Sequence, residues 1–435
     1  MNHDSSVATQ VHSMLLALVL VGCGSGLNEP NGAEARNGSE DLPTAAVGSS
    51  SSSSGASESR ASDGSTGAGF GSVDNHGEGM DGIIPAPITV TVTGSNPAEA
   101  RSEEGSGVDA AGGASDTPTT GMQRWEQKRA ALLEMIGRPL VPLDARETAL
   151  PDDAGLTVHD FSIATDDSTR INGTSFAPKQ AGPLPAVIFL HGTGGSRQDG
   201  FGLLRTLAQK GFFALAIDAR YHGPGIGQDP YFEAIYQAYV TGQGHPFLYD
   251  TVWDVMRLLD YLGQRSDVDA SRIGLVGNSK GGMETYLSAA VEPRIAVAVP
   301  WISVESFAWA LDNNSWQARV DSIRGAFDKA AAHDGVAIDV AFVRQFYDRV
   351  VPGIVDEFDG PQMVGAIAPR PLLAVNGAVD PRTPMGGLRL CEAAARSAYA
   401  DVSDHFDLYI EPDTGHAVTA EGTARSVDWF VKWLQ

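Results

Sequence analysis

The sequence is poor in cysteine and in basic residues. Its two cysteines, Cys23 and Cys391, are too few for a disulfide framework or a cysteine-rich zinc site. Lys and Arg number 30 against 54 Asp and Glu, for a formal net charge of −24. This negative excess argues against binding to nucleic acid or to an anionic membrane surface. The apolar run Met14–Val21 is too short to span a bilayer as a mature helix.

The first quarter of the chain has the composition of a segment that does not fold. Residues Gly24–Thr120 are dominated by Gly, Ser, Ala and acidic residues, with 14 Asp and Glu, three arginines and an unbroken serine run, Ser49–Ser54. Such a segment buries too little apolar surface to offset the entropy lost on ordering. We therefore expect a disordered linker, or tether, over residues 24–120 and a single folded domain over residues 121–435.

Residues 1–23 have features of an export signal. The run Met14–Val21 leads into Leu20-Val21-Gly22-Cys23, which resembles the signal-peptide box of bacterial lipoproteins. Cleavage before Cys23 would leave a lipid-bearing N-terminus, through which alone we expect membrane association. Residues 1–13 contain no Lys or Arg, unlike an ordinary signal, so a misassigned start or a plain secretory signal stays open. We expect an exported protein, anchored as a lipoprotein or else secreted.

Residues Gly277–Gly281 contain the clearest candidate for a catalytic residue. They read Gly-Asn-Ser-Lys-Gly and follow the apolar run Arg272–Val276. A short β-branched run followed by a helix-like segment is typical of a strand-to-helix turn that exposes a serine, the nucleophile elbow. The turn crowds the backbone, so glycine is needed on both sides of the serine. The pattern also arises by chance in glycine-rich loops, but its flanks favour the elbow. We predict Ser279 as a nucleophile.

A serine nucleophile needs a general base and a carboxylate that orients the base. With this elbow, the acid and then the histidine follow the serine along the chain, each after a strand. Asp380 follows the strand-like run Pro371–Gly377, and His416 follows the alternating run Phe406–Ile410. We predict Asp380 as the acid and His416 as the base.

Other residues compete for both roles. Asp413 and Glu305 are alternative acids, since Asp is common in turns that follow strands. Among the histidines, His405 begins a strand rather than leaving one, while His191 and His222 precede the serine in the chain. Chain order therefore favours His416.

A tetrahedral intermediate also needs two backbone N–H donors. The first is the amide of Lys280, directly after the nucleophile. The strand-like run Ala186–Leu190 leads into His191-Gly192-Thr193-Gly194-Gly195, and we predict the Thr193 amide as the second donor. A phosphate-binding loop is the alternative, but the segment lacks both standard glycine-rich phosphate motifs.

Together these motifs, with Asp218–Gly223, resemble the α/β-hydrolase superfamily, and within it the dienelactone-hydrolase-like and acetyl-xylan-esterase-like serine esterases. The resemblance runs from Leu156 to the C-terminus. It implies a Ser-His-Asp mechanism with no metal and no organic cofactor. Some dienelactone hydrolases carry cysteine where this chain has Ser279, so the resemblance does not by itself imply their particular substrate.

The alternation of elements predicts an α/β fold, a doubly wound and mostly parallel sheet. We expect a hairpin over residues 157–176 and strands near residues 186, 213, 273, 295, 372 and 408, with amphipathic helices near 252–262 and 427–434. Residues 302–365 exceed what the sheet needs, and we interpret them as a helical cap. Its aromatic residues either shape a pocket or simply hold the cap to the body; they are Trp309, Trp316, Phe342, Phe346 and Tyr347.

The site as a whole predicts a serine hydrolase that cleaves carboxylic esters through an acyl-enzyme. The substrate would be a carbohydrate ester, a small ester or a lactone. We expect His191, Gly192, His222, Trp301 and Trp309 to line it, with Asp218 anchoring the loops. A peptidase similar to prolyl oligopeptidases is the alternative, although residues 24–120 cannot build the propeller that such enzymes usually carry. A binding protein that has lost catalysis is the third reading.

Overall fold

The protein is described by a computed structural model over residues 121–180 and 182–435. The predictions for residues 1–120, which concern the signal peptide, Cys23 and the linker, lie outside the described residues. Within the described ranges, no helix combines the length and apolar character needed to cross a membrane.

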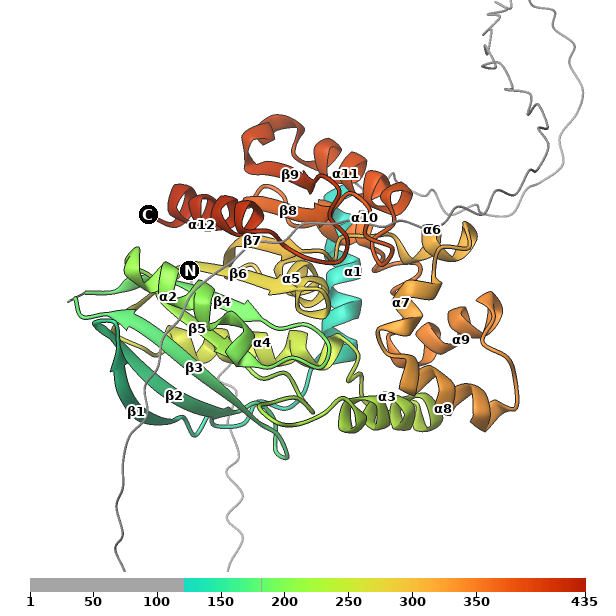
Figure 1. Ribbon diagram of the computed structural model, residues 1–435, viewed down its shortest axis with the longest axis horizontal. Helices are drawn as coiled ribbons and strands as arrows, with labels where there is room; N and C mark the ends of the chain where they lie inside the picture. The colour runs from blue at the N-terminus through green and yellow to red at the C-terminus, as the bar shows by residue number, and fades with distance from the viewer. Residues whose placement is uncertain (1–120, 181) are drawn as a thin grey trace, which may run out of the picture. The chain divides into compact units, whose positions relative to one another are not determined.

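The core of the described part is a nine-stranded sheet in the order β1-β2-β3-β5-β4-β6-β7-β8-β9 (Figure 1). The pairs β1/β2, β2/β3 and β3/β5 are antiparallel, and the pairs from β5/β4 onward are parallel. The strands are β1 (Arg146–Asp153), β2 (Leu156–Ala164), β3 (Arg170–Pro178), β4 (Leu184–Leu190), β5 (Phe213–Ile217), β6 (Val268–Asn278), β7 (Ile295–Trp301), β8 (Leu372–Gly377) and β9 (Phe406–Glu411).

Helices cover both faces of the sheet, so the predicted doubly wound α/β fold is confirmed (Figure 1). One buried cluster joins the sheet to α4 and α5, and the other joins it to α2 and α12. The helices outside the insertion described below are α1 (Gly121–Ile136), η1 (Arg197–Gly200), α2 (Phe201–Gln209), α3 (Asp229–Thr241), α4 (Tyr249–Gly263), α5 (Lys280–Val291), α11 (Met385–Ala398), η2 (Ala400–His405) and α12 (Ala420–Leu434).

The central strands are as apolar as their sequences predict. Every residue of β4, β5 and β8 is buried, as expected of strands covered on both faces. The predicted hairpin is β2 and β3, and each of the other predicted strands is present. Strand β1 was missed because seven of its eight residues are exposed, which leaves no apolar alternation to recognise.

An insertion of five short helices follows β7 and precedes β8. They are α6 (Phe307–Asp312), α7 (Gln317–Asp321), α8 (Arg324–Asp334), α9 (Val340–Val350) and α10 (Gly360–Gly365). Phe346 stacks on Phe327, with ring centroids 3.8 Å apart, and on Tyr239 of α3, at 5.3 Å. These buried rings hold the insertion to α3. Its role as a cap that shapes a substrate pocket stays a prediction.

The parallel strands bring the predicted site residues to one edge of the sheet. The loop with Thr193 leaves β4, Ser279 follows β6, Asp380 follows β8 and His416 follows β9. Because parallel strands point the same way, these four segments gather at their carboxyl ends, where open α/β sheets bind ligands.

Candidate active site

Ser279 lies in a strained strand-to-helix turn between β6 and α5. Its φ of 55° and ψ of −111° are unusual for a residue with a side chain. The Ser279 N–H donates to the carbonyl of Trp301 at 3.0 Å, which fixes the turn against β7. A Cβ at Gly277 would collide with the carbonyl of Gly281, and one at Gly281 with the carbonyl of Leu190. Both elbow glycines are therefore required by backbone contact.

A continuous chain of hydrogen bonds links Ser279 to His416 and Asp380. The Ser279 Oγ lies 2.7 Å from His416 Nε2, and His416 Nδ1 lies 2.7 Å from Asp380 Oδ2. Asp380 is 3% exposed and also accepts from the Arg382 amide at 2.9 Å and the Thr383 hydroxyl at 3.0 Å. Both Asp380 oxygens are thus bonded, and the carboxylate is held in one orientation.

The ionisation of this pair suits proton transfer from the serine. Burial raises the pKa of Asp380, but the bond and charge of His416 and the Arg382 and Thr383 donors outweigh it, and the pKa ends below its ordinary value. Burial lowers the pKa of His416; Asp380 raises it in part, while Arg319 and Arg382 lower it further, and the net shift is downward. At neutral pH, Asp380 is ionised and His416 is neutral, with Nε2 free to accept a proton.

The competing acids and the competing base make no hydrogen bond to His416 or Ser279 within the described residues. Asp413 is exposed and His405 Nδ1 hydrogen-bonds the Pro369 carbonyl at 2.6 Å. Glu305 is 1% exposed, with its Oε1 2.6 Å from Arg319 Nε. Burial raises the pKa of Glu305 to about 8, with Arg319 opposing and the charges of Asp359 and Asp380 adding to the rise. Glu305 is thus paired with Arg319 and not with His416, whose Nδ1 bonds Asp380, so Glu305 does not orient the catalytic histidine.

The loop after β4 lies directly against the nucleophile. A Cβ built on Gly192 would be 3.6 Å from the Ser279 Cβ. Neither the Thr193 amide, one residue on, nor the Lys280 amide at the N-terminus of α5 donates a hydrogen bond within the described part of the chain. Unpaired amides at a helix N-terminus favour negative charge. The two predicted oxyanion donors are therefore available.

Two residues predicted to line the substrate site have other roles. His191 is 1% exposed; its Nδ1 bonds the Gly192 carbonyl at 2.7 Å and its Nε2 accepts from the Ala219 amide at 3.0 Å, so no ring nitrogen is left for a ligand. Trp301 is 7% exposed, and its Nε1 donates to Ser426 of α12 at 2.8 Å. The alternation along β7 turns the Trp301 ring into the α12 side of the core, which corrects that prediction.

The other predicted contacts stay predictions. Trp309 is half-buried on α6 and packs so closely on Gly386 of α11 that a Cβ there would collide with its ring. Trp309 thus borders the segment that follows Asp380. His222 is buried beside His191, with ring centroids 4.9 Å apart. Its Nδ1 bonds the Arg220 carbonyl at 2.8 Å, and its Nε2 has no partner within the described residues.

Sequence reasoning missed the charged groups around the site. The Lys280 side chain turns inward and pairs with Glu284 at 2.6 Å, with both side chains 1% exposed. The spacing of four residues was a signal for this pair. Asp218 does anchor the loops as predicted, because its Oδ1 accepts from the Arg197 amide at 2.8 Å and its Oδ2 pairs with the Arg197 guanidinium. Over residues 121–180 and 182–435, no cluster of three or more His, Cys, Asp or Glu could hold a metal ion.

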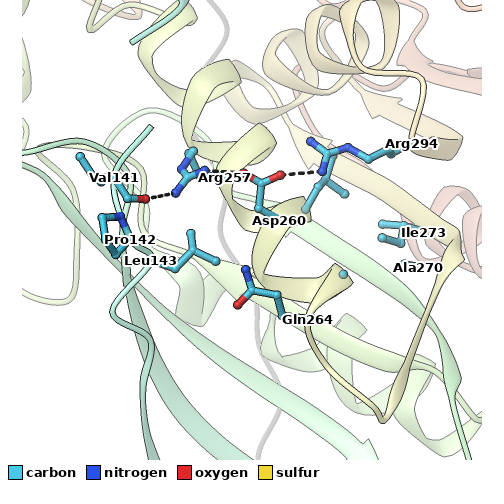
Figure 2. Close-up of a pocket in the computed structure, with 11 residues that line it drawn as sticks. Val141, Pro142, Leu143, Arg257, Asp260, Gln264, Ala270, Ile273 and Arg294 are labelled. Atoms are coloured by element: carbon cyan, nitrogen blue, oxygen red, sulfur yellow. Dashed lines mark hydrogen bonds and ion pairs between the residues drawn. The ribbon is translucent and has the colours of Figure 1, made fainter. Parts of the chain in front are cut away.

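A cavity of about 470 Å³ lies away from this chemistry (Figure 2). The residues that line it include Gln264 at the end of α4 and Ile273 of β6. Arg257 and Asp260, which pair with each other, line it as well. These residues mark the amino ends of the parallel strands, the edge opposite Ser279. This cavity is therefore separate from the ester site.

The chain is similar to known esterases and hydrolases. Residues 163–402, more than half of the chain, match the model of the family described as "Glucuronyl esterase, fungi". The Bacillus subtilis (strain 168) protein YtaP, whose name assigns it to the hydrolases, is 28% identical over 286 residues, which are 61% of this chain and 86% of that protein. The 4-O-methyl-glucuronoyl methylesterase 1 of Sodiomyces alcalophilus is 26% identical over 188 residues, 42% of this chain and 36% of that protein.

Solved structures share the fold. An acetyl xylan esterase from Paenibacillus sp. R4 aligns with a TM-score of 0.53 and 22% identity, covering 71% of this chain and 93% of that one. A glucuronoyl esterase from Solibacter usitatus aligns with a TM-score of 0.52 and 15% identity, covering 74% and 96%. The predicted resemblance to α/β-hydrolase esterases is confirmed. The chain belongs to the family described as "Glucuronyl esterase, fungi" and is a serine carboxylic ester hydrolase.

Proposed function

We propose that this enzyme hydrolyses carboxylic esters of carbohydrates, and uronate esters in particular, with Ser279, His416 and Asp380 as its catalytic triad. The observation that carries the proposal is the hydrogen-bond chain from the Ser279 Oγ through both nitrogens of His416 to Asp380, each step 2.7 Å long. The family to which the chain belongs supports the substrate class. In a uronate ester the sugar carries the acyl group, so the sugar would form the acyl-enzyme.

The reaction follows from the two protonation states. Ser279 Oγ attacks the ester carbonyl while its proton passes to His416 Nε2, and the carbonyl electron pair moves onto an oxyanion between the Thr193 and Lys280 amides. Asp380 stabilises the imidazolium that forms. Collapse breaks the bond to the alcohol, which leaves with the proton from His416. Water then repeats the sequence on the acyl-enzyme and releases the uronic acid and free Ser279.

A substrate panel tests this proposal. We expect kcat/KM for a methyl ester of glucuronic acid to exceed that for an acetylated xylo-oligosaccharide by about tenfold, which corresponds to one or two hydrogen bonds to the sugar that carries the acyl group. An aminoacyl amide should be turned over more slowly than either ester. Faster turnover of the amide would instead support a peptidase, and faster turnover of the acetyl ester would exclude the uronate preference.

The pH dependence tests the role of His416. Burial holds the pKa of His416 below the ordinary imidazole value of 6.5, so the base stays neutral further into acid. We expect kcat/KM on a neutral ester to fall as pH falls, with a midpoint below 6.5 in a pH series at constant ionic strength. His222 does not contribute to this midpoint, because burial and the charge of Lys280 lower the pKa of His222 to about 3. A midpoint at or above the ordinary imidazole value would argue against His416.

A further inference from the structure

The antiparallel end of the sheet presents a polar face. In the strand register, Arg146 pairs with Ser162, Ser162 with Asn172, and Thr148 with Asp160. Directly paired residues project to the same face, so all five side chains lie side by side. The Asp218 amide bonds the Asn172 carbonyl at 2.9 Å, which brings this face to the carboxyl end of β5, the edge where Ser279 lies.

Two cavities follow this face. The first has a volume of about 440 Å³ and the second about 340 Å³, and both are lined by Asn172, Asp218 and His222, so they adjoin there. We call the two together the polar groove. The first also contains Arg146, Thr148, Asp160, Ser162 and Arg197; the second contains Ser168, Thr169, Arg170, Arg220 and Tyr221.

The polar groove begins beside the predicted oxyanion loop. Arg197 lies four residues after Thr193 and is fixed to Asp218 through both its amide and its guanidinium. His222 packs on His191, whose Nδ1 binds the Gly192 carbonyl. The groove therefore adjoins the segment that carries Gly192 and Thr193, and we expect a ligand that extends past this loop from the ester site to reach it.

Tyr221 lines the groove in an unfavourable conformation. It sits at the third position of a turn closed by the bond from the His222 amide to the Ala219 carbonyl at 3.0 Å, and its φ is 64°. Glycine suits that position, and a bulky residue does not. Tyr221 is also 46% exposed, and it is the only aromatic residue among the exposed large hydrophobic residues of the described ranges. The Tyr221 ring is thus partly exposed, and its burial does not offset the free energy of the strained backbone.

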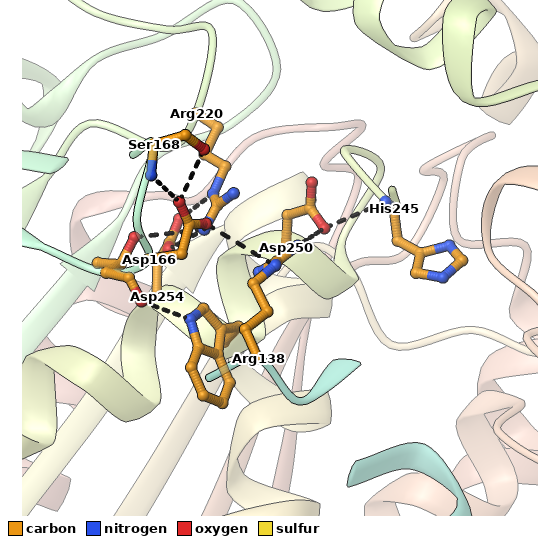
Figure 3. A network of polar contacts seen from close by, with 9 residues as sticks. Arg138, Asp166, Ser168, Arg220, His245, Asp250 and Asp254 are labelled. Atoms are coloured by element: carbon orange, nitrogen blue, oxygen red, sulfur yellow. Dashed lines mark hydrogen bonds and ion pairs between the residues drawn. The ribbon is translucent and has the colours of Figure 1, made fainter. Parts of the chain in front are cut away.

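The neighbours of Tyr221 are fixed firmly enough to impose that strain. Figure 3 shows Arg220 in a network with Asp166 and Asp254; its guanidinium meets both oxygens of Asp254, at 2.6 and 2.8 Å, and Asp166 at 2.9 Å. On the other side, His222 is tied back to the Arg220 carbonyl. Backbone strain that is enforced by its surroundings is found at ligand sites.

We propose that the polar groove binds the sugar units next to the one that carries the scissile ester, with Tyr221 as a stacking platform. Carboxylate, amide, hydroxyl and guanidinium groups along one wall match the hydroxyls of a pyranose, and an outward aromatic ring matches its apolar C–H face. The proposal rests on the proposed function, since only a carbohydrate ester brings such units to the site.

A blocking variant tests the groove. Thr148→Trp places a large ring in it from an exposed strand that tolerates tryptophan, while Ala149→Trp places the same ring on the opposite face of β1 as a control. We expect Thr148→Trp to lower kcat/KM about tenfold on a methyl glucuronate ester carried by a xylo-oligosaccharide, the equivalent of one or two lost hydrogen bonds. The free methyl glucuronate ester should be unaffected. Equal values for both variants on the oligosaccharide ester would overturn the proposal.

A second variant separates binding from stability. Tyr221→Gly removes the platform and relieves the positive φ, so we expect a melting temperature equal to or above that of the wild type with a lower kcat/KM on the oligosaccharide ester only. A purely structural Tyr221 predicts the reverse, a lower melting temperature and no change in the ratio of the two substrates.

The same experiments distinguish an error in the groove proposal from an error in the proposed function. If the wild type hydrolyses neither carbohydrate ester, the proposed function is wrong, and the groove is judged by calorimetric titration with xylohexaose. Binding that is present in the wild type and in Ala149→Trp but lost in Thr148→Trp supports the groove by itself. No binding to the wild type overturns it.

Discussion

Replacing Ser279 with alanine is expected to lower kcat/KM on a glucuronate methyl ester by about 10⁴-fold or more, because only the oxyanion donors and substrate binding would remain. The fold should persist, since the Ser279 side chain bonds only His416 and alanine keeps the same backbone. Steady-state kinetics and a thermal melt on the same sample measure the two effects.

Ser288→Ala is the matched control for this substitution. Ser288 lies on α5, is fully buried, and its hydroxyl has no hydrogen-bond partner within the described residues. Removing an unsatisfied hydroxyl should be neutral or stabilising, with activity unchanged. Turnover by Ser279→Ala close to that of Ser288→Ala would mean that another group is the nucleophile.

Replacing Asp380 with asparagine should also cost about 10⁴-fold in kcat. The amide is nearly the same size, so the fold should hold, but it cannot stabilise the imidazolium and its NH₂ group favours the wrong tautomer of His416. The loss should appear in kcat more than in KM, because Asp380 bonds His416, Arg382 and Thr383 and is 3% exposed.

Glu305→Gln is the control for the acid. Glu305 is paired with Arg319 and makes no bond to His416, and glutamine nearly keeps the shape of its side chain. We expect kcat to change by less than about tenfold, within the range of a modest repacking effect. If Glu305→Gln is the more damaging variant and Asp380→Asn the milder one, the catalytic acid has been misassigned.

The sequence predicted the fold where burial leaves a periodic signal. Strands such as Leu184–Leu190 and Leu372–Gly377 are buried on both faces and therefore read as continuous apolar runs. Strand Arg146–Asp153 is an exposed edge, and its charged, irregular sequence resembles a loop. The polar groove could not be predicted for the same reason, because strand Arg146–Asp153 forms one of its walls.

The positions of Ser279, Asp380 and His416 could be predicted because each follows a strand of the parallel sheet, and the carboxyl ends of such strands converge. Side-chain direction could not be predicted in the same way. Trp301 and His191 lie on the right segments, yet one ring turns into the core and the other bonds only backbone. Long-range ion pairs, such as Arg220 with Asp254, depend on which loops meet and have no local signature.

Ser279 is expected to be the group that becomes acylated. The most direct measurement is intact-protein and peptide mass spectrometry after treatment of the native enzyme with a serine-directed fluorophosphonate. We expect a single adduct that maps to Ser279 and disappears in Ser279→Ala, while Ser288→Ala is labelled as fully as the wild type. An adduct on another residue, or undiminished labelling of Ser279→Ala, would contradict the account.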